Sequence, residues 1–338
     1  MGKYQVGFTS ITAYDSSRAA VKEQIVKGKG RVLQINVWYP AIDNCTPKIN
    51  FNEYVQLIAK EINPHKENRL LAFTTFYDWT FQNKSPSQEM LEFKKNGVKM
   101  NASFDPKPHD DSFPLVLLIH GGAGDFAFLG EFLASHGYIV MNVPYKGYMQ
   151  AELDVEIVGM QTEVKDYEFA LERIKDQMPI DVANLSGIGA SFGGQWALSF
   201  SFKNKVKCVI SYDGGIGSEF GANLLQSDPS YSLKKIDTPQ LHFYNPNDIY
   251  TNLSFIRQYE HSDRTLISMK NMEHAHFWAW GILDRYLPNV INNVRTGNSY
   301  EAVLQETLNF ISKYAKEKEM ICDWCEDYQN SKEWLKAS

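Results

Sequence analysis

The residues best suited to chemistry form one short stretch, Gly189-Ala190-Ser191-Phe192-Gly193. It fits the pattern G-x-S-x-G, in which a serine lies on a tight turn from strand to helix and is exposed above a sheet. Residues 184–190 before the turn are small and strand-like, and residues 195–202 form an apolar, helix-like run. This context favours a nucleophilic serine at Ser191, although the pattern alone also fits an ordinary glycine-rich turn.

A serine hydroxyl is a weak nucleophile until a base removes its proton, and the base is commonly a histidine oriented by a carboxylate. His274 follows the last expected strand and is the preferred base, with His276 as the alternative. Asp213 and Asp248 each end an apolar run and satisfy the order serine, aspartate, histidine. The residues alone leave the choice of acid open, because either aspartate could simply form a turn.

The tetrahedral intermediate of acyl transfer carries a negative oxygen that needs backbone N–H donors. The amide of Phe192, directly after the serine, is expected to be one donor. The Gly122 amide, in the loop His120-Gly-Gly-Ala-Gly124, is the candidate for the second. This loop fits neither G-x-G-x-x-G nor a Walker motif, so a nucleotide site is not expected. No cofactor is predicted, and no metal either, since the pair His274 and His276 lacks a third ligand.

Strands and helices are expected to alternate from residue 113 onward, which predicts a mainly parallel sheet with helices on both faces. The expected strands are residues 114–120, 138–143, 184–190, 206–212, 240–244 and 264–269. The expected helices are residues 125–135, 155–178, 195–202, 252–259 and 300–316. Partners of Ser191 should therefore lie at the carboxyl ends of the strands, where loops converge.

The first third of the chain is less regular. Residues 4–12 and 31–39 alternate in the manner of an antiparallel strand pair. Residues 41–102 are interpreted as a helical, aromatic-rich insertion in a single domain that covers residues 1–338. The aromatic side chains of residues 70–81, together with Tyr145, Tyr148 and residues 277–280, could wall an acyl or aryl pocket or simply be core. Residues 317–338 are expected to be a charged tail.

Composition argues against several classes of function. The net charge of −6 and a pI of about 5.8 disfavour nucleic-acid binding through bulk electrostatics. No apolar run is long enough to predict a membrane span. The first residues lack the apolar core of a signal peptide, so we expect a cytoplasmic location, or a periplasmic or secreted one if a leader has been removed. Cys322 and Cys325 have C-x-x-C spacing, for which a local disulfide or free thiols are expected rather than zinc.

With these elements in this order, residues 113–316 resemble the α/β-hydrolase superfamily. Over its whole length the chain is similar to the dienelactone-hydrolase-like and platelet-activating-factor-acetylhydrolase-like branch. The matching segments are FPLVLLIHGG, LASHGYIVMNVP, IGASFGGQWAL, VISYDGG and MEHAHF. The resemblance implies an α/β-hydrolase fold and a serine hydrolase that cleaves a small-molecule carboxylic ester through an acyl-enzyme.

The resemblance also bears on the acid and the base. In the acetylhydrolase-like branch the acid follows the strand after the nucleophile, where Asp213 lies, and in the dienelactone-hydrolase-like branch it comes one strand later, where Asp248 lies. Asp213 is preferred. The pattern His-x-x-Phe of that branch matches His274 and Phe277. The alternative functions are a peptidase or amidase that uses the same triad and a catalytically silent binding protein. No oligomeric state is implied.

Overall fold

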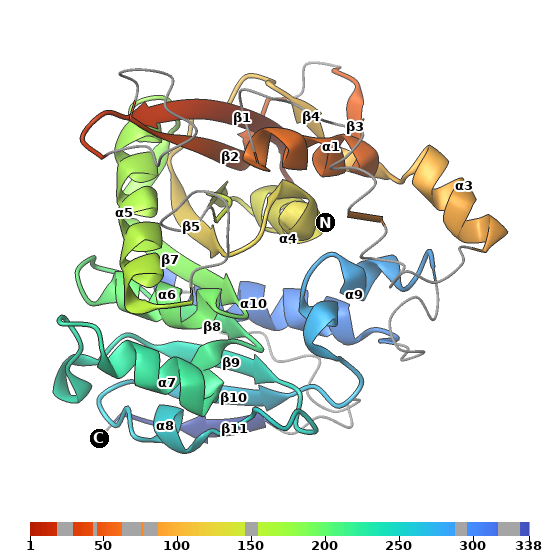
Figure 1. Ribbon diagram of the computed structural model, residues 1–338. Coiled ribbons are helices and arrows are strands. Elements are labelled where there is room, and N and C mark those ends of the chain that lie inside the picture. The colour runs from red at the N-terminus through yellow and green to blue at the C-terminus, as the bar shows by residue number, and fades with distance from the viewer. Residues whose placement is uncertain are drawn as a thin grey trace.

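The computed structural model describes residues 1–18, 30–42, 46–62, 76–77, 87–145, 155–287, 296–316 and 332–337. Its strands are β1 (Gln5–Asp15), β2 (Arg31–Ala41), β3 (Lys48–Asn50), β4 (Lys99–Phe104), β5 (Phe113–Ile119), β6 (Ile139–Asn142), β7 (Ile180–Ala190), β8 (Val209–Tyr212), β9 (Gln240–Tyr244), β10 (Arg264–Ser268) and β11 (Lys332–Leu335). They form one twisted sheet in the order β11-β10-β9-β8-β7-β5-β6-β2-β1-β4-β3 (Figure 1).

The centre of the sheet is parallel. Strands β6, β5, β7, β8, β9 and β10 all run in the same direction. Strands β1 and β2 form the expected antiparallel pair, and β2 joins them to the parallel part through an antiparallel contact with β6. This arrangement confirms the predicted mainly parallel α/β sheet with an antiparallel N-terminal pair.

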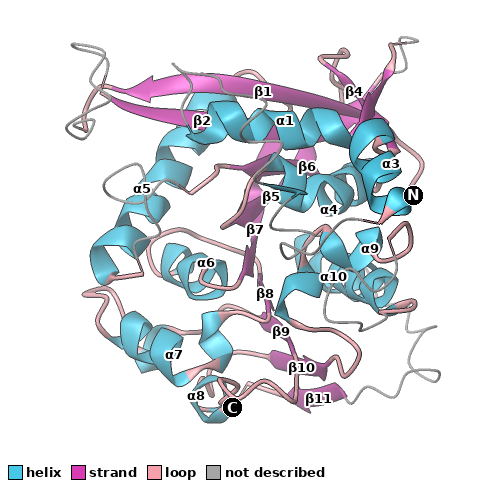
Figure 2. Ribbon diagram, turned by 45° about the vertical axis from the view of Figure 1, so that its right-hand side comes forward, coloured by secondary structure: helices cyan, strands magenta, loops and turns pink. Residues whose placement is uncertain are grey.

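Helices cover both faces of the sheet, as predicted. They are α1 (Phe51–Ile62), α3 (Gln88–Asn96), α4 (Ala123–Ser135), α5 (Ile157–Ile174), α6 (Gly193–Ser201), α7 (Glu219–Gln226), α8 (Ser254–Arg257), α9 (Trp280–Leu283) and α10 (Ser299–Ala315). Figure 2 views the sheet nearly edge-on, with α5, α6 and α7 on one side and α1, α4, α9 and α10 on the other. No helix in the described part of the chain is both long and apolar enough to cross a membrane.

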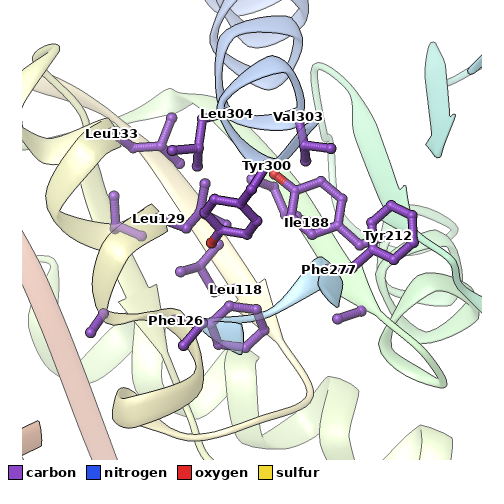
Figure 3. Packing of buried hydrophobic residues seen from close by; sticks show 14 of the residues in the cluster. Leu118, Phe126, Leu129, Leu133, Ile188, Tyr212, Phe277, Tyr300, Val303 and Leu304 are labelled. Atoms are coloured by element: carbon purple, nitrogen blue, oxygen red, sulfur yellow. The ribbon is translucent and has the colours of Figure 1, made fainter. Parts of the chain in front are cut away.

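Each face of the sheet packs against its own hydrophobic core. Along β5, whose seven residues are all buried, Leu115, Leu117 and Ile119 face the core under α5 and α6. Val116 and Leu118 face the opposite core, under α4 and α10. Figure 3 shows this second core, in which Leu118 lies near residues of α4 and α10. The strict alternation explains the continuous apolar run in the sequence, because a strand covered on both faces has no polar side.

Two segments differ from the expectation. Residues 41–102, interpreted as a helical insertion, contain the helices α1 and α3 but also the strand β3, which together with β4 extends the sheet beyond β1. Residues 332–335, expected within a charged tail, pair as β11 with β10. A strand of only four residues, KEWL, is too short to give a periodic signal that can be recognised in a sequence. Cys322 and Cys325 lie outside the described residues.

Two buried polar groups connect the elements. The Glu131 carboxylate of α4 accepts hydrogen bonds from the Asn101 and Ala102 amides of β4 and from the Tyr54 hydroxyl of α1. On the other face, Arg31 donates two hydrogen bonds to Asp166 of α5, at 2.8 and 2.6 Å. Glu163 lies one turn from Asp166, and both of its carboxylate oxygens are buried without a hydrogen-bond donor among the described residues. Burial and the neighbouring Asp166 charge raise the pKa of Glu163 well above its usual value.

Candidate active site

Ser191 lies between the end of β7 and the start of α6, at the turn that the sequence predicts. Its φ angle is 53°, in the left-handed region that a residue with a Cβ rarely adopts. A Cβ atom on Gly189 would lie 1.9 Å from the Gly193 carbonyl oxygen, so the strand and the helix approach too closely for a side chain there. The turn is fixed by two hydrogen bonds, from the Ser191 amide to the Tyr212 carbonyl and from the Gly215 amide to the Ser191 carbonyl.

Backbone strain recurs at this edge of the sheet. Among the described non-glycine residues, positive φ angles occur at Asp105, His120, Ser191 and Asp213. The last three directly follow β5, β7 and β8, which are neighbours in the sheet. Strained backbone of this kind is concentrated at functional sites, where the surrounding structure holds it in place.

Asp213 comes next to Ser191 because β8 pairs with β7 in parallel register. Its side chain is only 6% exposed, and its carboxylate is held from two sides. One oxygen accepts a hydrogen bond from the Asn245 amide at 3.0 Å, and the other lies 2.7 Å from Nδ1 of His274. The carboxylate therefore has a fixed orientation toward the imidazole.

His274 begins a short 3-10 turn, His274–Phe277, after β10. Its Nε2 lies 3.0 Å from Oγ of Ser191, while Nδ1 faces Asp213. The ring packs edge-on against Trp278, with 5.0 Å between the ring centroids. Phe277, at the end of the turn, is buried beside Tyr212 of β8 (Figure 3). The loop is thus anchored in the core while its first residue reaches the serine.

The two alternative residues lie elsewhere. His276 is fully buried, and its Nδ1 accepts a hydrogen bond from the Glu273 amide at 2.9 Å. Burial lowers the pKa of His276. The Asp248 carboxylate instead accepts a hydrogen bond from the Tyr250 amide, within its own turn. The structure therefore brings Ser191, His274 and Asp213 together and leaves His276 and Asp248 out of that chain of hydrogen bonds.

The two candidate oxyanion donors differ in their surroundings. The Phe192 amide has no hydrogen-bond acceptor among the described residues. The Gly122 amide donates to Oδ2 of Asp125, at 2.8 Å. Burial raises the pKa of Asp125 to about 6, and the bond from Gly122 lowers it in part. The Asp125 carbonyl also accepts a hydrogen bond from the Ala279 amide, so this residue joins the loop after β5 to the segment that follows His274.

An open cavity of about 950 Å³ adjoins the serine. Ser191, Asp213 and His274 line it, and most of its other lining residues come from the segments after β8 and β9. No motif in the sequence indicates these walls of the cavity. Phe220, Ile249 and Tyr250 line the cavity and are 52%, 87% and 75% exposed. Of the aromatic residues for which a pocket or the core was considered, Phe76, Tyr77, Phe277 and Trp280 are buried in the core, and Tyr148 lies outside the described residues.

The acidic, histidine and cysteine side chains in the described part of the chain are its candidate metal ligands. Within it, no group of three or more His, Cys, Asp or Glu side chains could hold a metal ion. The site brings together the hydroxyl of Ser191, the imidazole of His274 and the carboxylate of Asp213. In this order they can move a proton from the serine to the histidine and stabilise the imidazolium that results.

Comparisons with known proteins show the fold. No protein-family model matches the chain, and no curated protein matches it significantly. Among solved structures, it is similar to a ferulic acid esterase from Streptomyces cinnamoneus, with a TM-score of 0.67 and 16% sequence identity. The alignment covers 99% of this chain and 97% of the esterase. The likeness extends over essentially the whole of both chains and shows an α/β-hydrolase-like fold.

Proposed function

We propose that this protein is a serine hydrolase that cleaves carboxylic esters through an acyl-enzyme intermediate. The observation that carries the proposal is the continuous hydrogen-bonded chain from Ser191 through His274 to Asp213, with distances of 3.0 and 2.7 Å. Both distances lie within the range expected of a nucleophile, its base and an orienting acid. The strained turn at Ser191 supports the same conclusion, because an ordinary serine would not require a left-handed φ.

In the proposed reaction, Oγ of Ser191 attacks the acyl carbon while Nε2 of His274 takes its proton. Asp213 holds the imidazole by Nδ1 and stabilises its positive charge. The imidazolium then gives the proton to the leaving alcohol as the carbon–oxygen bond breaks, which leaves an acyl ester on Ser191. Water attacks this ester with His274 again as the base, releasing the acid and restoring the serine.

The Phe192 and Gly122 amides are the proposed oxyanion donors. The Phe192 N–H is the first donor, directly after the nucleophile. The Gly122 N–H is bonded to Asp125 in the structure, so binding of the oxyanion has to replace or share that bond. Because a donor is effective only when it points at the developing oxyanion, the Gly122 N–H would serve only after release from Asp125, whereas the Phe192 N–H has no such bond to break.

The similar solved structure and the lining of the cavity both indicate which class of ester to test. The similar solved structure is that of a ferulic acid esterase. The aromatic and aliphatic walls at Phe192, Phe220 and Ile249 are compatible with an aromatic ester. The order of the acid, directly after the strand that follows the nucleophile, supports a place in the acetylhydrolase-like branch. Aryl and hydroxycinnamate esters are therefore the first substrates to test.

The proposal is tested with p-nitrophenyl acetate, methyl ferulate and a fluorophosphonate probe. Ser191→Ala and His274→Gln are expected to lose at least about 10³-fold in kcat, and Ser191→Ala should no longer be labelled. Asp213→Asn should lose about 10³- to 10⁴-fold, whereas Asp248→Asn should lose far less. Ester hydrolysis that persists in Ser191→Ala would overturn the mechanism. Cleavage of anilides but not of esters would indicate an amidase, and failure of the probe to label Ser191 would indicate a silent binding protein.

A further inference from the structure

Two carboxylates face the cavity without a role in the proposed reaction. Glu219 begins α7, and Asp248 lies in the loop after β9. Their segments are joined by a β-bridge between Ser218 and Thr251 and by a hydrogen bond from the Asn252 amide to the Gly217 carbonyl at 2.7 Å. The two acids therefore lie on one wall of the cavity that contains Ser191.

The charge of this cavity is negative. Glu219, Asp248 and Asp213 contribute carboxylates to its lining, and only Asp213 is paired, with His274. In the described part of the chain, no Lys or Arg lines the cavity, and neither Glu219 nor Asp248 has an ion-pair partner. The other histidine of the lining, His242, is 1% exposed, and burial lowers its pKa to about 4. It is therefore neutral at pH 7 and does not offset the carboxylates.

Other features of the same walls point to a bound ligand. Phe192 and Phe220 meet edge to face, with centroids 5.8 Å apart. The large side chains of Phe220, Ile249 and Tyr250 are exposed beside the nucleophile, where a bound apolar group would cover them. His242 also lines the cavity, with its imidazole buried beside the Ser211 backbone. Aromatic faces combined with carboxylates attract positive charge and disfavour negative charge.

We propose that this cavity selects esters whose bound group is apolar and either neutral or cationic, and that Glu219 and Asp248 exclude anionic esters. This proposal rests on the proposed function, because the selected group is defined by its place beside Ser191. An anion in the cavity would lie close to the side chains of Glu219, which is exposed, and Asp248, which is half-buried and accepts one hydrogen bond from the Tyr250 amide; neither carboxylate has an ion-pair partner among the described residues. At separations of several ångströms and an intermediate dielectric constant, such repulsion corresponds to about a tenfold loss or more.

The test uses phenyl acetates and methyl benzoates that carry a 4-tert-butyl, 4-trimethylammonio or 4-sulfonato group. The three substituents are similar in size and differ in charge, and the two series place the charge on the alcohol or on the acyl side. Each kcat/KM is divided by the hydroxide-catalysed rate constant of the same ester, which removes differences in intrinsic reactivity. Measurements at low and high salt give the electrostatic share of any preference.

In at least one series, the normalised kcat/KM of the sulfonate ester is expected to be about tenfold or more below that of the tert-butyl ester. The normalised kcat/KM of the trimethylammonio ester should equal or exceed that of the tert-butyl ester. The double variant Glu219→Gln, Asp248→Asn should reduce this preference to about threefold or less. The matched control is Asp110→Asn, Asp111→Asn, which removes two exposed carboxylates just before β5, at the opposite end of the parallel strands. The control should keep the wild-type preference.

The proposal is overturned if wild-type enzyme treats anionic and neutral esters alike, or if the double variant keeps the wild-type preference. It is also overturned if the control reduces the preference equally, since net charge would then be the cause. These results are distinct from failure of the proposed function. In that case the probe would leave Ser191 unlabelled and every ester in both series would remain intact, which would overturn both proposals.

Discussion

The left-handed backbone at Ser191 predicts that the serine is held at a cost in stability. The variants Ser191→Ala and Ser191→Gly both remove the nucleophile, so they differ only in the backbone. A Cβ in the left-handed region costs about 1–2 kcal/mol, which glycine avoids. Glycine also loses about 0.5–1 kcal/mol through the greater freedom of the unfolded chain. With φ at 53°, we expect Ser191→Gly to be more stable than Ser191→Ala by about 1 kcal/mol.

The measurement is the free energy of unfolding from urea titrations of both variants, supported by thermal melts. A matched pair at Ser186 serves as the control, because this buried residue of β7 has no left-handed φ. There, Ser186→Gly should be less stable than Ser186→Ala by about 0.5–1 kcal/mol. If glycine is the less stable residue at position 191 as well, the turn stores no strain and the reasoning fails.

Three further predictions concern buried ionisable groups. Glu131→Ala leaves the Asn101 and Ala102 amides without their acceptor, so the free energy of unfolding in urea should fall by about 3–5 kcal/mol. The loss should be smaller for Glu131→Gln, which keeps one acceptor oxygen. A loss below about 1 kcal/mol in Glu131→Ala would contradict this role. The pKa of Glu163 is raised in the folded state, so the stability of wild type is greatest below the unfolded pKa of 4.5 and falls as pH rises and the buried carboxyl has to ionise. Glu163→Gln cannot ionise at this position. Its free energy of unfolding should therefore exceed that of wild type by about 1–2 kcal/mol at pH 8, and the difference should close toward pH 4. Burial lowers the pKa of His242 to about 4, so the neutral imidazole stabilises the fold above pH 6.5, and up to about 3 kcal/mol of stability is lost as pH falls. In His242→Asn, the free energy of unfolding should therefore depend less on pH between 6.5 and 4.5. The same slope as in wild type would contradict this role of His242.

The alternation of strands and helices could be predicted from the sequence because the central strands are buried on both faces and are therefore continuous apolar runs. β5 and β9 begin and end within one residue of the predicted bounds. Short elements were not accessible. A helix was predicted over residues 252–259, but the structure has only the single turn Ser254–Arg257, and α7 was not predicted at all. One or two turns carry too little periodicity to be distinguished from a loop.

In the candidate site, too, local features could be predicted from the sequence, and features set by tertiary contacts could not. Ser191 was identified because its motif and the close approach of Gly189 to Gly193 are local in the chain. The choice between Asp213 and Asp248 depends on where a side chain points after its strand ends, which the residue types do not encode. The cavity walls at Phe220 and Tyr250 depend on the bridge between Ser218 and Thr251, two segments more than thirty residues apart. Such walls are set by tertiary contacts and not by a motif.

The position of β11 has a consequence for solubility. Strand β10 is the last parallel strand, and without a neighbour it would expose a row of unpaired amides and carbonyls. β11 covers that edge, and the Lys332–Glu306 and Arg257–Glu333 ion pairs fasten it to the body of the fold. The Ala337 amide adds a bond to Asp263. This short charged segment thus protects the edge of β10 from pairing with another chain, and loosening it would expose that edge to intermolecular strand pairing.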